Sequence, residues 1–203
     1  KKQEYGNIFL AAHALAGAVP HFISHLGAMA FHNMLVQPSR TVHISTVRRR
    51  TPQDVGGSRI EFVIVPKTRL WGWRDEWVTD THRSPVSDIE RTILDGCHRP
   101  DLCGGIVEVS RAAWLVKDRM DAGRLLKYVK RFGKFAVAKR LGFILETLKI
   151  GSGETLGRLR HFAARSRPYI NLDPILPPKG RLNSRWRLRL NVTAGELQAA
   201  VQT

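Results

Sequence analysis

The longest regular pattern in the sequence is helical, and it runs from Ser87 to about residue 165. Within it, Leu125, Val129 and Phe132 form a stripe at helical spacing that predicts a buried face. The middle of the chain is therefore expected to be almost entirely helical. The predicted helices cover residues 87–97, 104–117, 122–132, 134–149 and 154–165.

Both flanks of this helical part contain segments typical of β-strands. Val42 and Ile44 alternate with polar residues, and the sequence Asp54-Val55-Gly56-Gly57 predicts a turn before the next strand. Near the C-terminus, extended segments lie on either side of a proline-rich loop. The predicted extended segments are residues 41–47, 59–65, 169–172 and 185–191, and residues 71–80 are expected to form a further hairpin and strand.

An apolar run at residues 8–19 lies where a signal peptide would lie. Glu4 and Asn7 do not fit the basic segment that precedes such a peptide, and His13 interrupts the apolar run. The run is also shorter than the roughly 20 residues of a membrane span. We therefore expect a buried first helix and no membrane association.

Two helices are expected before the first strand, at about residues 3–18 and 22–34, divided at Pro20. Together with the strands they predict an α/β (α+β) fold, in which one mixed sheet carries a helical subdomain in a single compact unit. We expect an N-terminal α/β part at about 1–100, a helical part at about 101–165 and C-terminal strands at 166–203.

The charge of the chain is its most unusual property. It has 33 Lys and Arg against 17 Asp and Glu, a formal net charge of +16. Such an excess favours polyanionic partners: nucleic acid, nucleotide phosphates or an acidic protein surface. The two cysteines, Cys97 and Cys103, match no disulfide framework and no common zinc spacing. We expect reduced thiols in the cytoplasm and no metal site.

Two groups of basic residues are regularly spaced. Four follow one another at helical spacing from the helix predicted at 122–132 to residue 134, opposite the apolar stripe, and three alternate with Trp186 and Leu188 at strand spacing. Both groups are candidate anion-binding faces, although a solvated helix face and an edge strand protected by charge would have the same sequence. The residues are Arg124, Lys127, Arg131 and Lys134 in the helix and Arg185, Arg187 and Arg189 in the tail.

A cluster of polar residues lies at the start of the long helical part. Ser87 and Glu90 have the spacing of a helix capping box, which explains these two residues structurally. Asp88, Arg91 and Asp95 are less well explained and are the candidate acid and base residues if the chain catalyses a reaction. No P-loop, protein-kinase, serine-hydrolase or His-Glu-x-x-His motif is present. Whether the chain is an enzyme is therefore left open.

Several motifs resemble the AbiEi antitoxin family in sequence and order. The two longer ones are Ser24-His25-Leu26-Gly27-Ala28-Met29-Ala30-Phe31-His32 and Ser87-Asp88-Ile89-Glu90-Arg91-Thr92-Ile93-Leu94-Asp95. The resemblance extends from about residue 9 to 191. The shorter motifs are Gly104-Gly105, Lys139-Arg140-Leu141-Gly142-Phe143-Ile144-Leu145-Glu146, Leu172-Asp173-Pro174 and Arg185-Trp186.

The resemblance implies a cytoplasmic bacterial antitoxin whose partner is a nucleotidyltransferase toxin. Antitoxins of this family are associated with neutralisation without a stable complex. One route proposed for the group is phosphorylation of the toxin by the antitoxin as an atypical serine kinase, which would require ATP and Mg²⁺. Members commonly carry an N-terminal winged helix that binds the operator, and no such segment fits ahead of residue 9 in this sequence.

Packing does not explain all the residues of these motifs equally well. Arg140 is one of the least explained, and we count it among the candidate anion-binding residues. The alternative function is a nucleic-acid-binding transcriptional regulator that acts through the two basic faces. Apart from that alternative, the charge predicts nonspecific binding to nucleic acid that weakens as salt rises.

Overall fold

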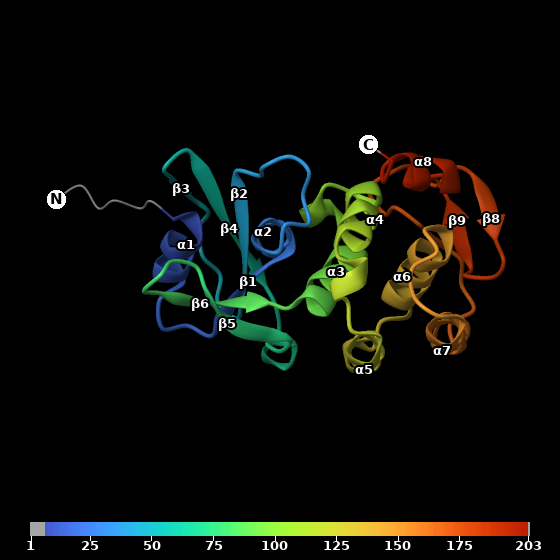
Figure 1. The fold of residues 1–203 in the computed structure, drawn as a ribbon, viewed down its shortest axis with the longest axis horizontal. Helices are drawn as coiled ribbons and strands as arrows, with labels where there is room; N and C mark the ends of the chain where they lie inside the picture. Colours follow the sequence, from blue (N-terminus) through green and yellow to red (C-terminus); the bar gives the residue numbers. More distant parts are fainter. Residues whose placement is uncertain (1–6, 203) are drawn as a thin grey trace. The chain divides into compact units, whose positions relative to one another are not determined.

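The computed structural model describes residues 7–202 (Figure 1). Along the chain it forms two compact units, one ending at Thr92 and one beginning at Ile93. We call them the sheet unit and the helical unit. The predicted α/β class, a mixed sheet together with a helical part, is confirmed.

The sheet unit contains six strands in one mixed sheet. They are β1 (His21–Ser24), β2 (Thr41–Thr46), β3 (Gln53–Val55), β4 (Ser58–Ile64), β5 (Trp73–Trp77) and β6 (Arg83–Ser87). Their order is β3-β4-β2-β1-β6-β5. β2 runs parallel to β4 and β1 parallel to β6, while the other neighbours are antiparallel.

Helices α1 (Ile8–Ala16) and α2 (His25–Phe31) pack on one face of this sheet. Ile23 and Ile44 are paired across β1 and β2, so both point to that face, where alanines of α1 are buried against them. A Cβ atom on Gly27 of α2 would lie 3.0 Å from Val42 Cγ1. The absence of a side chain therefore lets α2 approach the sheet closely.

The predicted helix at 22–34 is wrong in its first part. Residues 21–24 form β1, which pairs with β2 on one side and with β6 on the other. Phe22 and Ile23 favour strands, and a central position gives both edges of their backbone a hydrogen-bonding partner. The helix begins only at His25, whose φ of +48° turns the chain out of the strand.

The other expectations for this unit need smaller corrections. The predicted helix at 3–18 is observed as α1, although residues 3–6 lie outside the described part of the chain. The predicted strands at 41–47 and 59–65 are confirmed as β2 and β4. The Gly56-Gly57 turn joins β3 to β4, and the partner of β5 is β6, for which no strand was predicted.

All five helices predicted between residues 87 and 165 are present, with ends within two residues of those expected. They are α3 (Ile89–His98), α4 (Ile106–Leu115), α5 (Ala122–Phe132), α6 (Phe135–Thr147) and α7 (Gly153–Ala164). A further helix, α8 (Ala194–Ala199), was not predicted.

Helix α6 forms the centre of the helical unit, because every residue from Val137 to Leu145 is buried. A Cβ atom on Gly142 would lie 2.1 Å from Trp186 Cζ3, so this glycine leaves the space that the indole ring occupies. Trp186 is itself only 1% exposed. The tail thus supplies part of the core around α6.

The tail forms a small sheet in the order β7-β9-β8, made of β7 (Ile170–Asn171), β8 (Arg181–Asn183) and β9 (Leu188–Leu190). The predicted strand at 185–191 is thus too long at its start. Residues 184–187 form the turn of a β8–β9 hairpin, and Arg187 has a φ of +51°. That backbone conformation interrupts the extended alternation on which the prediction depended.

The predicted capping box at Ser87 is wrong by one residue. Helix α3 begins at Ile89, and the carboxylate of Asp88 accepts a hydrogen bond from the Arg91 amide at 2.9 Å. Ser87 is the last residue of β6, and its hydroxyl shares a hydrogen bond with that of Thr92 at 2.8 Å. The strand therefore extends to the residue at which we expected the helix cap.

Candidate functional site

The positive charge is concentrated in the helical unit. From residue 93 onward the sequence has 21 Lys and Arg against 9 Asp and Glu, a formal charge of +12. The residues before it have 12 against 8, a charge of +4. Three quarters of the excess of +16 therefore belongs to one unit, and an anionic ligand is expected to bind there.

A cavity with a volume of about 720 Å³ lies between α5 and α7. Its walls combine apolar side chains with the long side chains of basic residues, a composition common in sites for ligands that have both an apolar and an anionic part. The apolar residues are Leu126, Val129, Leu159 and Phe162. The basic ones are Lys130, Arg158 and Arg165, with His161 beside them.

A second cavity, of about 490 Å³, is lined by α7 and by the turn of the β8–β9 hairpin. Its cations are Arg160, Arg185 and Arg187. Gly157 and His161 line both cavities, so the two meet along one ridge of α7. None of the described residues that line either cavity is an Asp or a Glu.

Hydrogen bonds and ring contacts orient several of these cations. Arg185 Nε lies 2.8 Å from Glu146, and Arg187 donates to the Arg167 carbonyl at 2.9 Å. The guanidinium of Arg165 lies 5.8 Å from the centre of the Phe162 ring. These cations are thus partly ordered without a ligand, which would lower the entropy cost of binding an anion.

The basic face predicted on α5 has the expected geometry for three of its four residues, because the helix ends at Phe132, before Lys134. Leu125, Val129 and Phe132 are buried, as their spacing predicted. On the other side of the helix Lys127 and Arg131 are exposed and Arg124 lies 3.6 Å from Asp121, whereas Lys134 follows the end of α5 and is the N-cap residue of α6. None of these four cations lines the cavity between α5 and α7, for which α5 supplies Lys130 instead.

The row of three arginines predicted in the tail is not a single strand face. Arg185 and Arg187 lie in the hairpin turn and line the second cavity, whereas Arg189 lies in β9 and donates to the Pro178 carbonyl at 3.0 Å. Trp186 and Leu188 are buried, as expected. The alternation of burial is therefore confirmed, and the straight cationic row is not.

Arg140 lies in the interior and not on an anion-binding surface. Its guanidinium donates to the Cys97 carbonyl at 3.0 Å and to the Asn171 carbonyl at 3.3 Å. The neighbouring Lys139 donates to the Pro168 carbonyl at 2.6 Å. Burial lowers the pKa of both Lys139 and Arg140. Both cations fix backbone segments against α6.

The predicted catalytic residue Arg91 is only 1% exposed. Its guanidinium donates to the carbonyls of Arg69 and Trp71 at 3.0 and 2.5 Å, and it lies over the rings of Trp71 and Phe22 at 4.4 and 5.2 Å. Asp88 is buried as well and caps α3. The contacts of both residues hold the sheet unit together.

Asp95, the third predicted catalytic residue, is buried in the helical unit near the Cys103 thiol. Burial raises the pKa of Cys97 to about 12, and it raises that of Cys103 well above the usual range, with Asp95 adding to the effect. Thiols with such pKa values are poor nucleophiles at neutral pH. We therefore do not count the cysteines as candidate catalytic groups.

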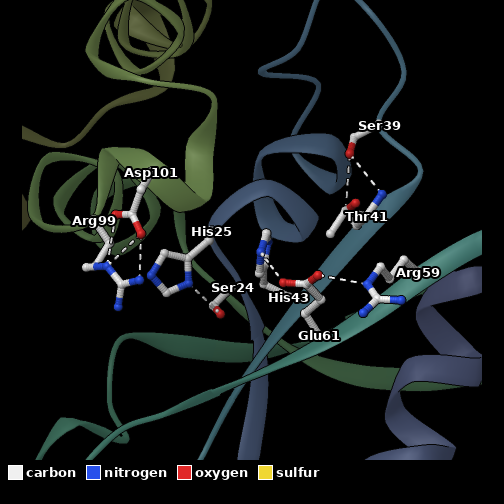
Figure 2. A network of polar contacts seen from close by, with 9 residues as sticks. All are labelled: Ser24, His25, Ser39, Thr41, His43, Arg59, Glu61, Arg99 and Asp101. Atoms are coloured by element: carbon white, nitrogen blue, oxygen red, sulfur yellow. Dashed lines mark hydrogen bonds and ion pairs between the residues drawn. The ribbon is translucent and has the colours of Figure 1, made fainter. Parts of the chain in front are cut away.

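A polar network crosses the other face of the sheet unit (Figure 2). The hydroxyls of Ser24 and Ser45 lie 2.8 Å apart, and Nδ1 of His25 lies 2.9 Å from the Ser24 hydroxyl. His43 lies 3.7 Å from the Glu61 carboxylate. Apart from Glu61 these groups are almost completely buried, so they join strands β1, β2 and β4 and do not present a reactive group to solvent.

The structure also bears on metal sites and on membrane-spanning helices, two features that the sequence does not predict. Among residues 7–202, no cluster of three or more His, Cys, Asp or Glu has the arrangement that a metal ion needs. Within the same described range, none of the helices has the length and hydrophobicity required to cross a membrane.

The cations of α7 were not predicted as a site. Arg158, Arg160 and Arg165 occur in a helix whose first turn contains Glu154, so they resembled the solvated face of an ordinary helix. The one unusual signal is Gly157, a glycine in the interior of a helix. Only the fold reveals that two cavities meet at this glycine.

Comparison with known proteins bears on the fold alone. No protein-family model and no curated protein matches the chain. A solved structure that resembles it is the crystal structure of the RV2827C protein from Mycobacterium tuberculosis. The TM-score is 0.62 at 14% sequence identity, and the match covers 96% of this chain and 70% of that one. The chain thus has a fold similar to that of the mycobacterial protein.

Proposed function

We propose that the chain is a cytoplasmic antitoxin of the AbiEi type that neutralises a nucleotidyltransferase toxin. The observation that carries this proposal is that four of the separated motifs which resemble that family contact each other in two pairs. Asp173 accepts a hydrogen bond from the Ile106 amide, directly after Gly104-Gly105, at 2.8 Å. Trp186 packs on Gly142 and donates to the Glu146 carboxylate at 2.8 Å.

Contacts between motifs strengthen the resemblance for a physical reason. Residues that touch in a packed interior must fit one another in size and polarity, so they cannot vary independently. Motifs that keep the family's order and also share contacts are therefore better support than the same motifs scattered over a surface.

The site favours neutralisation by binding over phosphorylation. Asp88 and Arg91 are used in capping and in hydrogen bonds to carbonyls, and both are buried. The exposed cations of the helical unit, by contrast, lie at the surface, where they can contact an acidic face of the toxin or its nucleotide. We propose that this basic surface holds the toxin by charge, with ATP and Mg²⁺ required only if the phosphorylating route operates.

Rescue of cells that express the toxin encoded by the neighbouring gene tests the proposal. Lys127→Glu with Arg131→Glu reverses two exposed cations of α5 and is expected to abolish rescue. The matched control is Arg48→Glu with Arg49→Glu in the sheet unit, which also lowers the net charge from +16 to +12 and is expected to retain rescue. If wild-type protein gives no rescue, the antitoxin proposal fails.

The phosphorylating route has its own test. Purified protein is incubated with the toxin, ATP and Mg²⁺, and the toxin is examined by mass spectrometry. We expect no added phosphate. A phosphorylated toxin, together with loss of the modification in a stably folded Asp95→Asn variant, would replace the binding mode by the enzymatic one.

A nucleic-acid-binding regulator is the second candidate. The formal charge of +12 in the helical unit favours it, because Lys and Arg side chains that neutralise backbone phosphates supply most of the sequence-independent affinity for nucleic acid. A footprint on the promoter of its own operon that persists at physiological salt would support this function. Binding that disappears between 50 and 200 mM salt would indicate nonspecific attraction only.

A further inference from the structure

We infer that the two cavities on either side of α7 form one groove for a single-stranded segment of nucleic acid. A base would enter the cavity between α5 and α7, and the phosphates would cross Gly157 to the cations beside the β8–β9 turn. We call this the α7 groove. The inference goes beyond the antitoxin proposal and does not depend on it.

Charge is the first argument for such a ligand. The α7 groove is lined by Lys130, Arg158 and Arg165 on one side of the helix and by Arg160, Arg185 and Arg187 on the other. Lys130 and Arg160 are exposed and form no ion pair with the described residues. A single ligand could contact cations on both sides of the helix only if it carries anionic groups at more than one place, and a phosphodiester chain has one at every nucleotide.

The shape of the first cavity is the second argument. Its volume of about 720 Å³ exceeds what a phosphate needs, and its wall is formed by Leu126, Leu159 and the partly buried Phe162. An aromatic ring beside an arginine, as Phe162 lies beside Arg165, is a common platform for an unstacked base. In a duplex the bases are stacked and paired, so they could not enter this cavity.

Gly157 is the third argument. A glycine inside a helix destabilises it by about 1 kcal/mol relative to alanine, and is usually explained by close packing or a positive φ. Gly157 has neither explanation, since a Cβ atom there would meet nothing within 4 Å. A residue without a side chain at the ridge where the two cavities meet leaves a path for a ligand that passes from one to the other.

Fluorescence anisotropy with labelled oligonucleotides tests the ligand class. The probes are octauridylate, octathymidylate, an eight-unit abasic phosphodiester of equal charge and a blunt duplex. We expect both single strands to bind more tightly than the duplex, and the abasic chain to bind about tenfold more weakly than octathymidylate because stacking is lost. The ratio of the affinities for octauridylate and octathymidylate then shows whether RNA or DNA is the preferred ligand.

Substitution of Gly157 tests the path. Gly157→Gln places a long side chain on the ridge and is expected to weaken binding of octauridylate at least tenfold. The matched control is Gly153→Gln in the same helix, since Gly153 also has open space around it and lines neither cavity. Circular dichroism melts check that both variants fold.

Removal of one cation on each side tests the charges. Lys130→Ala with Arg160→Ala should lower the slope of log affinity against log salt by about 1.4, because each phosphate contact on a single strand contributes about 0.7. Arg48→Ala with Lys179→Ala removes two exposed charges outside the α7 groove and should leave the slope unchanged.

Equal or tighter binding of the duplex, or an unchanged affinity in Gly157→Gln, would overturn the inference in favour of diffuse electrostatic attraction. The outcomes also separate the two proposals. Rescue of toxin-expressing cells without oligonucleotide binding would contradict the α7 groove proposal and support the antitoxin proposal. Oligonucleotide binding without rescue would support the α7 groove proposal and contradict the antitoxin proposal.

Discussion

Trp186 lies so close to Gly142 that the space for a side chain on α6 is filled by an indole ring from the tail. The Nε1 of this indole donates to Glu146, one turn further along the same helix, at 2.8 Å. Gly142 leaves space for the indole ring of Trp186, and Glu146 accepts its hydrogen bond, so the two residues together fix the position of this side chain. The contact joins the last part of the chain to the centre of the helical unit.

Gly142→Ala is therefore expected to lower the stability of the protein, although alanine favours helices. The added methyl group would overlap the ring, and overpacking of this kind costs about 1–3 kcal/mol. Gly157→Ala is the matched control: with open space around it, the substitution should increase stability by up to about 1 kcal/mol. Urea denaturation measures both changes, and a stabilising Gly142→Ala would contradict the packing.

Arg91→Lys tests whether Arg91 is structural. A lysine cannot donate to the Arg69 and Trp71 carbonyls and also stack as a guanidinium does, so a loss of about 2 kcal/mol is expected. Thermal melts are the measurement. A variant that has unchanged stability but no longer rescues toxin-expressing cells would indicate that Arg91 takes part directly in the chemistry of neutralisation.

Two substitutions of Asp88 distinguish a role as the cap of α3 from a role as a general acid or base. Asp88→Asn keeps an oxygen for the Arg91 amide and should retain nearly full stability, whereas Asp88→Ala should lose about 1 kcal/mol. A general acid or base would respond differently, because asparagine cannot exchange a proton in that role. If stability is the only function of Asp88, Asp88→Asn retains full rescue.

Stability is expected to fall on mild acidification because of His21. Its Nε2 lies 2.9 Å from Nδ1 of His13, and its Nδ1 lies 2.6 Å from the Val19 carbonyl oxygen. Burial lowers the pKa of His21, and its neighbours His13 and Arg50 add to this effect. The unfolded chain therefore binds a proton at His21 more readily than the folded chain does. The contribution of the neutral His21 ring to the free energy of unfolding is complete above about pH 6.5, and it is lost as the pH falls through the pKa of the folded state.

Melts between pH 5 and 8 measure this dependence. His21→Gln should flatten the profile in the acidic range, because the variant has no imidazole to protonate at that position. Identical profiles for the wild type and the variant would show that acid destabilises the protein through other groups.

Neither thiol should react with a disulfide reagent at pH 8 while the protein is folded. Both are buried, and burial raises their pKa, that of Cys97 to about 12. Titration in denaturant should then reveal both thiols. Rapid reaction of the folded protein would mean that the core around α3 opens readily.

Helical periodicity predicted the fold best, since the buried stripe of α5 was evident from three residues alone. The strand β1 was missed because Phe22 and Ile23 fit a helix face as well as a central strand, and only pairing with β2 and β6 decides between them. Local spacing carries no information about such distant partners.

The candidate site was harder to predict for the same reason. The cations of Arg140 and Arg91 are buried by segments distant in sequence, whereas those of Arg158 and Arg160 border cavities that form only when α5, α7 and the hairpin come together. Charge and spacing identified basic residues correctly. They could not indicate which of them face solvent.

Helix α6 has a consequence for how the protein is made. Its two adjacent cations, Lys139 and Arg140, reach carbonyls of Pro168 and Asn171, and its glycine receives Trp186. A ribosome releases these partners long after α6 itself. Until then Lys139 lacks its acceptor and Arg140 has only the Cys97 carbonyl, so the helical unit can reach its final packing only after residues 168–186 have been synthesised.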